Sequence, residues 1–158
     1  MTGRKLLDVE RVVRQIGWAK LRKDAENNVL GPSYNAFILR DGEEYLSVVW
    51  CEYFDGAKDV QRDCAIHQLR NARQVGAKTH YWIAAVGDIK KIMISAGCRP
   101  RFIHEPVANI ASHAAVRRWR DASDDLLELL AADCISELVS NADVVDAAEL
   151  PCLVRGDL

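Results

Sequence analysis

The sequence lacks the features that mark several large classes of protein. It has no run of about 18 apolar residues, so no transmembrane helix is predicted, and the first residues lack the continuous apolar stretch of a secretory signal. Neither sign of charge is in excess. The 21 basic and 23 acidic residues give a formal net charge of −2, which provides no overall field for nucleic acid or an anionic membrane. We therefore expect a cytoplasmic protein without a membrane partner.

Common catalytic and metal-binding signatures are also missing. The sequence contains no serine nucleophile elbow, phosphate-binding glycine loop or dinucleotide fingerprint. The five cysteines include no CxxC pair, and we expect them to be reduced thiols, mostly buried. Cys64 with His67, and Cys98 with His104, would permit a mixed zinc site only if all four converged. We expect Cys64 in the core, predict no cofactor and leave the metal content open.

The composition is that of one ordinary globular domain. Hydrophobic residues make up 49% and charged residues 28% of the 158 residues, which suits a chain with one hydrophobic core. We expect the globular domain to span residues 1–140. Residues 141–158, which are acidic and contain Pro151 and Gly156, are expected to form a loosely held tail.

The first 32 residues give an ambiguous pattern. Leu6, Val9, Val13 and Ile16 follow a 3,4,3 spacing, which predicts a helix ending near residue 17. The alternative is a strand over residues 12–18. Residues 20–32 are charged and rich in asparagine, and are predicted to form an exposed loop.

The clearest strand signal surrounds Asp41-Gly42, a turn dipeptide. Apolar residues at 36–39 and 45–50 flank it and predict a β-hairpin. Further along the chain, apolar spacing predicts helices over 57–75 and 89–96 and strands over 81–86 and 101–104. Ser123 is expected to cap a long C-terminal helix reaching Leu138. The predicted fold class is α/β or α+β: a single domain with a small mixed sheet, containing one hairpin and flanked by helices.

Polar groups gather at His104-Glu105-Pro106 and His113. Two imidazoles and a carboxylate are suited to metal binding or general acid–base chemistry. The alternative, which we favour, is structural: His104 closes a strand, and Ser112 caps a short helix over residues 113–116.

Two further groups of candidates stand apart from these histidines. Ser47 and Glu52, on or just past the second predicted hairpin strand, are candidates to lie across a cleft from them. A basic run with an aromatic residue suits nucleic-acid binding. Three aspartates follow it within five residues, so a solvated helix end is the simpler interpretation. The run consists of Arg117, Arg118, Trp119 and Arg120.

Short segments of the chain resemble a group of small uncharacterised bacterial proteins. The resemblance rests on Ala36-Phe37, on residues 46–54 (LSVVWCEYF), on residues 104–106 (HEP) and on residues 112–114 (SHA). It implies a bacterial, cytoplasmic origin and assigns no catalytic residue.

Three functions are compatible with the sequence. The first is a non-enzymatic accessory or interaction protein whose partner is another protein, because no catalytic signature is present. The second is a small hydrolase or nuclease-like enzyme that uses His104, Glu105 and His113, with Ser47 or Glu52 across a cleft. The third is a nucleic-acid-binding module that uses residues 117–120. The sequence leaves open the oligomeric state and whether the protein is an enzyme.

Overall fold

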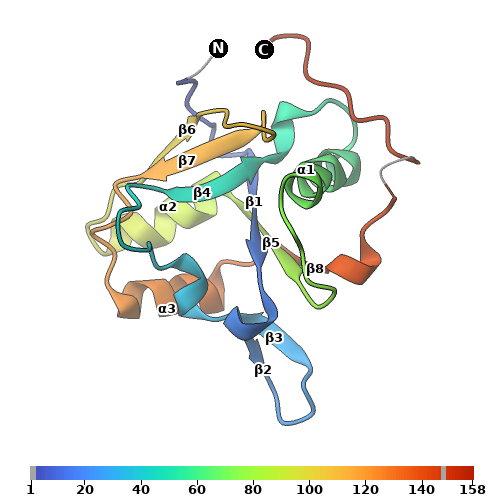
Figure 1. The fold of residues 1–158 in the computed structure, drawn as a ribbon. Coiled ribbons are helices and arrows are strands. Elements are labelled where there is room, and N and C mark those ends of the chain that lie inside the picture. Colours follow the sequence, from blue (N-terminus) through green and yellow to red (C-terminus); the bar gives the residue numbers. More distant parts are fainter. Residues whose placement is uncertain (1–2, 147–148) are drawn as a thin grey trace.

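Six strands form one sheet in which every neighbouring pair runs antiparallel (Figure 1). The computed structural model describes residues 3–146 and 149–158. Across the sheet the strands are β6 (Arg101–His104), β7 (His113–Arg117), β4 (Leu46–Trp50), β1 (Arg11–Ile16), β5 (His80–Ala85) and β8 (Glu137–Ser140).

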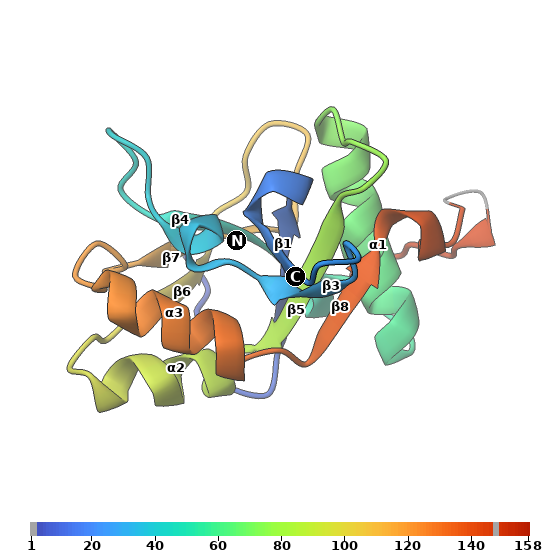
Figure 2. The same ribbon diagram turned by 90° about the horizontal axis from the view of Figure 1, so that it is seen from below.

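Helices cover both faces of this sheet (Figure 2). One core lies beneath α2 (Val86–Ser95) and α3 (Asp124–Asp133), and a second core lies beneath α1 (Lys58–Ala72). No helix in the described residues is long and apolar enough to cross a membrane. The remaining elements are a ribbon of β2 (Leu21–Lys23) and β3 (Val29–Pro32), and the 3₁₀ turns η1 (Trp18–Lys20), η2 (Tyr34–Phe37), η3 (Cys51–Tyr53) and η4 (Asn141–Asp143).

The structure confirms a single domain of mixed helix and sheet. The helices predicted over 57–75 and 89–96 are α1 and α2, and the strands predicted over 81–86 and 101–104 are β5 and β6. Ser123 caps α3 as expected, since its Oγ accepts a hydrogen bond of 3.2 Å from the backbone nitrogen of Leu126. These elements were predictable because their signals are local.

Two predictions near the N-terminus are wrong. The expected helix over Leu6–Ile16 is strand β1, close to the alternative of a strand over 12–18. Val9, assigned to the apolar face of that helix, is 82% exposed. Val12 and Val13, which are consecutive, are both buried, as in a strand covered on both faces. The expected loop at 20–32 contains the β2–β3 ribbon.

The predicted hairpin is also wrong. Residues Ala36 and Phe37 lie in η2, and β4 pairs with β1 and β7 instead. A turn is present, because the backbone nitrogen of Glu43 donates to the carbonyl of Arg40, but it does not join paired strands. All pairings between named strands are antiparallel, so the expected mixed sheet is not found.

Two helices expected late in the chain differ from the structure. Ser112 begins no helix, because residues 113–117 form β7. The expected long C-terminal helix ends at Asp133 after ten residues, and Leu138 belongs to β8. The apolar residues after Asp133 were assigned to a helix, yet β8 uses them to cover the edge of β5.

The C-terminal segment makes specific contacts, although we expected a loosely held tail. Cys152 forms a disulfide with Cys64 of α1, so these two cysteines are not the reduced thiols that the sequence suggested. Cys51, Cys98 and Cys134 are free and buried, as predicted. The backbone nitrogen of Asp55 donates to the carbonyl of Leu153 at 2.7 Å.

Strand β1 is paired with its two neighbours over unequal lengths. It pairs with β5 over all six of its residues, but with β4 only through Val12↔Trp50 and Val13↔Val49. Beyond Val13 the two strands diverge, and the carbonyl of Ser47 accepts a hydrogen bond from the Arg14 side chain. This divergence leaves a gap in the sheet where an interior strand pair would normally continue.

Candidate functional site

A cavity of about 310 Å³ opens where β1 and β4 diverge, beside the C-terminal end of α1. We call it the splay pocket. Much of its lining is polar or charged, although it lies over the sheet. The polar residues of the lining are Arg14, Gln15, Lys20, Arg40, Ser47, Arg73 and His113.

Ser47 and His113 meet in this pocket. The Nε2 atom of His113 lies 3.1 Å from the Oγ atom of Ser47. The two residues are diagonal neighbours on adjacent strands, because Val49 pairs with His113 while Ser47 pairs with Ala115. Residues two apart on a strand share a face, so the register points both side chains toward the α1 side of the sheet.

The hydrogen bonds of His113 fix its tautomer. Its Nδ1 atom lies 2.7 Å from the backbone carbonyl of Glu105. A carbonyl oxygen only accepts, so Nδ1 carries the proton and Nε2 accepts the hydroxyl proton of Ser47. Burial, assisted by the positive charge of Arg73, lowers the pKa of His113 below its ordinary value of 6.5. The ring is therefore neutral at pH 7 and able to accept a proton.

Arg14 occupies the gap between the two strands. Its Nε donates to the carbonyl of Ala36 at 2.8 Å, and its Nη1 donates to the carbonyl of Ser47 at 2.7 Å. Burial lowers the pKa of Arg14 to about 10; the charge of Glu43 opposes this shift, while Arg73 and Arg40 add to it. The guanidinium thus keeps its charge at neutral pH, held beside the backbone of Ser47.

Three more cations surround the same cavity. Lys20, Arg40 and Arg73 all line it, and burial followed by the charges of Arg14 and Arg40 lowers the pKa of Lys20. Within the described residues, none of the four cations of the pocket forms an ion pair with a carboxylate. The charge of Glu43 acts on Arg14 and Lys20, and its carboxylate accepts a hydrogen bond of 2.7 Å from the backbone nitrogen of Arg40. The pocket therefore carries an excess of positive charge.

Gln15 adds an unused acceptor to the pocket. Its Oε1 atom is buried and has no hydrogen-bond partner in the described part of the chain. A buried acceptor without a partner costs free energy, on the order of 1–3 kcal/mol. A ligand with a hydroxyl or amide donor would satisfy this atom.

The candidate cluster of His104, Glu105 and His113 does not assemble. His104 pairs with Ala114, so it points to the opposite face of the sheet from His113. There it packs against the rings of Trp50 and Tyr53, and its Nε2 lies 2.8 Å from the carbonyl of Ala111.

Glu105 is likewise occupied elsewhere. Its carboxylate accepts two hydrogen bonds from Arg117, of 2.6 and 2.7 Å, which lower the pKa of Glu105. Only its backbone carbonyl serves the site, by orienting His113. No group of three or more metal-ligating side chains occurs among residues 3–146 and 149–158.

The basic run at 117–120 is dispersed. Trp119 is buried, with its indole nitrogen donating to the carbonyl of Phe37 at 2.8 Å, so it presents no ring face for a base. Arg117 is paired with Glu105, and Arg120 donates to the backbone carbonyl of Glu43. Arg118 is exposed in a left-handed conformation with φ of 61°.

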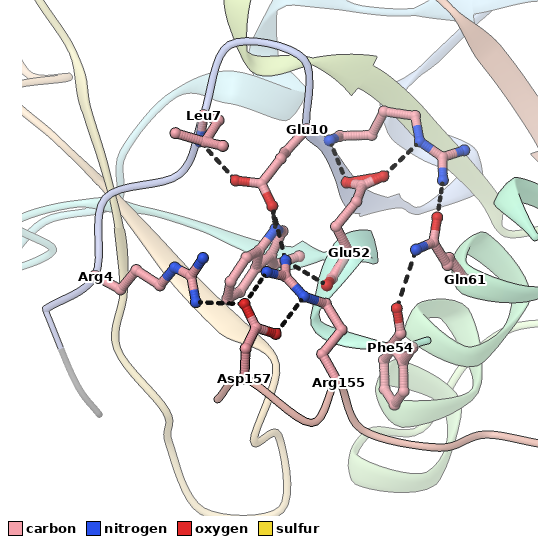
Figure 3. Close-up of polar contacts among 10 residues, drawn as sticks. Arg4, Leu7, Glu10, Glu52, Phe54, Gln61, Arg155 and Asp157 are labelled. Atoms are coloured by element: carbon pink, nitrogen blue, oxygen red, sulfur yellow. Dashed lines mark hydrogen bonds and ion pairs between the residues drawn. The ribbon is translucent and has the colours of Figure 1, made fainter. Parts of the chain in front are cut away.

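Glu52 belongs to a separate network that fastens the C-terminal segment to the sheet (Figure 3). Its carboxylate binds the Nε of Arg11 at 2.9 Å. Beside it, Arg155 donates to the buried carboxylate of Glu10 at 3.2 Å and pairs with Asp157. Every carboxylate of this network has a cationic partner, which indicates a structural role.

Ser47 and His113 were recognisable as candidates from the sequence, but the cations around them were not. The available signal was Arg14-Gln15 between apolar residues of β1, because a buried strand seldom carries a charge without a reason. Arg40 and Arg73 lie on distant segments and gave no signal. Comparisons of the chain with protein-family models, curated proteins and solved structures find no match, so the interpretation of the splay pocket depends on its geometry.

Proposed function

We propose that the protein binds a small anion of two or more negative charges, such as a phosphate monoester or a polycarboxylate, in the splay pocket. The observation that carries this proposal is the arrangement of Arg14, Lys20, Arg40 and Arg73 around one cavity, without carboxylate partners in the described residues. The four cations and the one carboxylate of Glu43 leave the pocket with an excess of positive charge, which a dianion would largely neutralise.

Arg14 supplies the energetic argument. Lowering its pKa from 12.5 to about 10 corresponds to about 3 kcal/mol of unfavourable free energy for the charged form, at about 1.4 kcal/mol per pKa unit. A bound anion recovers part of this energy, because opposite charges attract strongly where water is excluded. Planar guanidinium groups also match the oxygen geometry of phosphate and carboxylate groups.

Calorimetric titration with inorganic phosphate at constant ionic strength tests the proposal. We expect Arg40→Gln and Arg73→Gln each to weaken binding about tenfold, which equals about 1.4 kcal/mol. Both residues are exposed, so neither substitution should prevent folding. Arg99→Gln, also exposed but outside the pocket, is the matched control. Equal affinity in all variants, or no binding by the parent protein, would overturn the proposal.

The function expected first from the sequence, an accessory protein that binds another protein, stays a prediction. Ile94 on α2 and Leu129 on α3 are exposed apolar residues on one face of the molecule, which is compatible with a partner without identifying one. The bacterial origin and the cytoplasmic location stay predictions as well.

A further inference from the structure

We infer that Ser47 is a nucleophile and His113 its general base, in the hydrolysis of carboxylic esters whose acyl group ends in a negative charge. The inference rests on the proposed anion binding, because the cations of the splay pocket would hold the charged end of the acyl group. It extends that proposal from a ligand to a reaction.

The geometry of the pair supplies the first argument. The 3.1 Å bond joins the nucleophile to Nε2, the nitrogen left unprotonated by the bond from Nδ1 to the Glu105 carbonyl. A serine hydroxyl becomes nucleophilic when an adjacent base accepts its proton and a further group orients that base. Here a backbone carbonyl does the orienting, and the lowered pKa of His113 keeps its ring neutral at pH 7.

Accessibility supplies the second argument. Ser47 and His113 both line the splay pocket, so a ligand in the cavity contacts the pair directly. The Arg14 guanidinium lies against the carbonyl of Ser47 itself, through Nη1. Within the described residues its third nitrogen, Nη2, has no hydrogen-bond partner and is available to a developing oxyanion.

The charge of the pocket supplies the third argument. When Ser47 Oγ attacks the ester carbonyl, its proton passes to His113 Nε2, a C–O bond forms and the carbonyl oxygen becomes negative. An acyl group that already carries one carboxylate is thereby a dianion in the tetrahedral intermediate. A pocket with an excess of positive charge stabilises this intermediate more than the singly charged substrate, and such a difference accelerates the reaction.

The remaining steps balance with water as the only co-reactant. The intermediate collapses, the ester C–O bond breaks, and the leaving alcohol takes the proton from His113 Nε2. Water then attacks the acyl-Ser47 ester and gives a proton to Nε2. The second collapse returns that proton to Ser47 Oγ and releases the dicarboxylic acid.

Two measurements test the inference. The first is labelling with a fluorophosphonate, which modifies activated serines, followed by peptide mass spectrometry. We expect one adduct on Ser47, no adduct in Ser47→Ala, and labelling about 100-fold slower in His113→Gln, the lower range for loss of a general base. Ser95→Ala, an exposed serine outside the pocket, should be labelled like the parent.

The second measurement compares p-nitrophenyl hemiglutarate with p-nitrophenyl butyrate, which lacks the terminal carboxylate. We expect a higher kcat/KM for the charged ester, lost in Ser47→Ala, while Ser47→Ala still unfolds in one cooperative transition, which shows that the variant is folded. If phosphate binds but Ser47 is neither labelled nor required for hydrolysis, this inference fails and the anion-binding proposal stands. If phosphate does not bind either, both fail.

Discussion

The protonation of His113 leads to a prediction about stability as a function of pH. The residue is 2% exposed, and burial holds its pKa below the 6.5 of an unfolded chain. At a pH between these two pKa values, the His113 ring binds a proton in the unfolded chain but not in the folded protein. The stabilising contribution is therefore fully present above about pH 6.5 and is lost as the pH falls through the folded pKa.

The size of the effect follows from linkage. One proton taken up only by the unfolded state lowers the free energy of unfolding by at most about 1.4 kcal/mol for each pH unit below 6.5. His113→Asn removes this titration, and its amide nitrogen takes the place of Nδ1 as donor to Glu105. Lost packing should lower stability by about 1–3 kcal/mol, independently of pH.

Urea unfolding followed by tryptophan fluorescence, from about pH 5 to about pH 8, measures both terms. The difference in free energy of unfolding between the parent and His113→Asn should be constant above pH 6.5 and should shrink below it. A difference that stays constant over the whole range, or grows as the pH falls, would show that His113 is not held neutral. The assigned role as a base would then be wrong.

Three further predictions concern stability. The Cys64–Cys152 disulfide joins residues 88 apart, so Cys152→Ser should lower the free energy of unfolding by about 2–4 kcal/mol. The parent protein, unfolded without a reducing agent, should titrate three thiols rather than five. Arg155→Gln leaves the buried Glu10 carboxylate without its cation and should cost about 2 kcal/mol in urea unfolding; a change under about 0.5 kcal/mol would contradict the network in Figure 3. Ser123→Ala should cost about 1 kcal/mol through loss of the α3 cap, and an unchanged unfolding midpoint would refute that role.

The parts of the fold that were predictable from sequence are those whose signals are local. Helix α1 combines amphipathic spacing with a terminating residue, and β5 is a short apolar run between turn signals. Strand β1 was misassigned because Leu6, Val9, Val13 and Ile16 match helical spacing by coincidence. Helices α2 and α3 cover one face of β1 and α1 covers the other, and a strand buried on both faces shows no alternation of apolar and polar residues in the sequence.

The candidate site was only partly predictable for the same reason. Ser47 and His113 were both candidates, but His113 was grouped with His104, its neighbour along the chain. Strand alternation separates these histidines onto opposite faces, and the register between β4 and β7 brings Ser47 to His113 across 66 residues of sequence. No single-sequence pattern encodes that register.

The cations were still harder to predict. Arg14 reaches the gap because β1 and β4 diverge after two paired residues, and Arg73 reaches it because α1 ends beside it. Both facts are properties of the tertiary structure. The net charge of the whole chain is −2, and this total gives no sign of a pocket with positive charge.

Occupation of the splay pocket by an anion is the property on which both proposed roles of the protein depend most. Crystals soaked in tungstate, a tetrahedral dianion with strong anomalous scattering, give the most direct measurement. We predict an anomalous peak within hydrogen-bonding distance of the Arg14 guanidinium, with Arg40 or Arg73 as a second ligand, and its loss in Arg73→Gln crystals. Tungstate bound only at other sites, with the splay pocket holding water alone, would contradict the account.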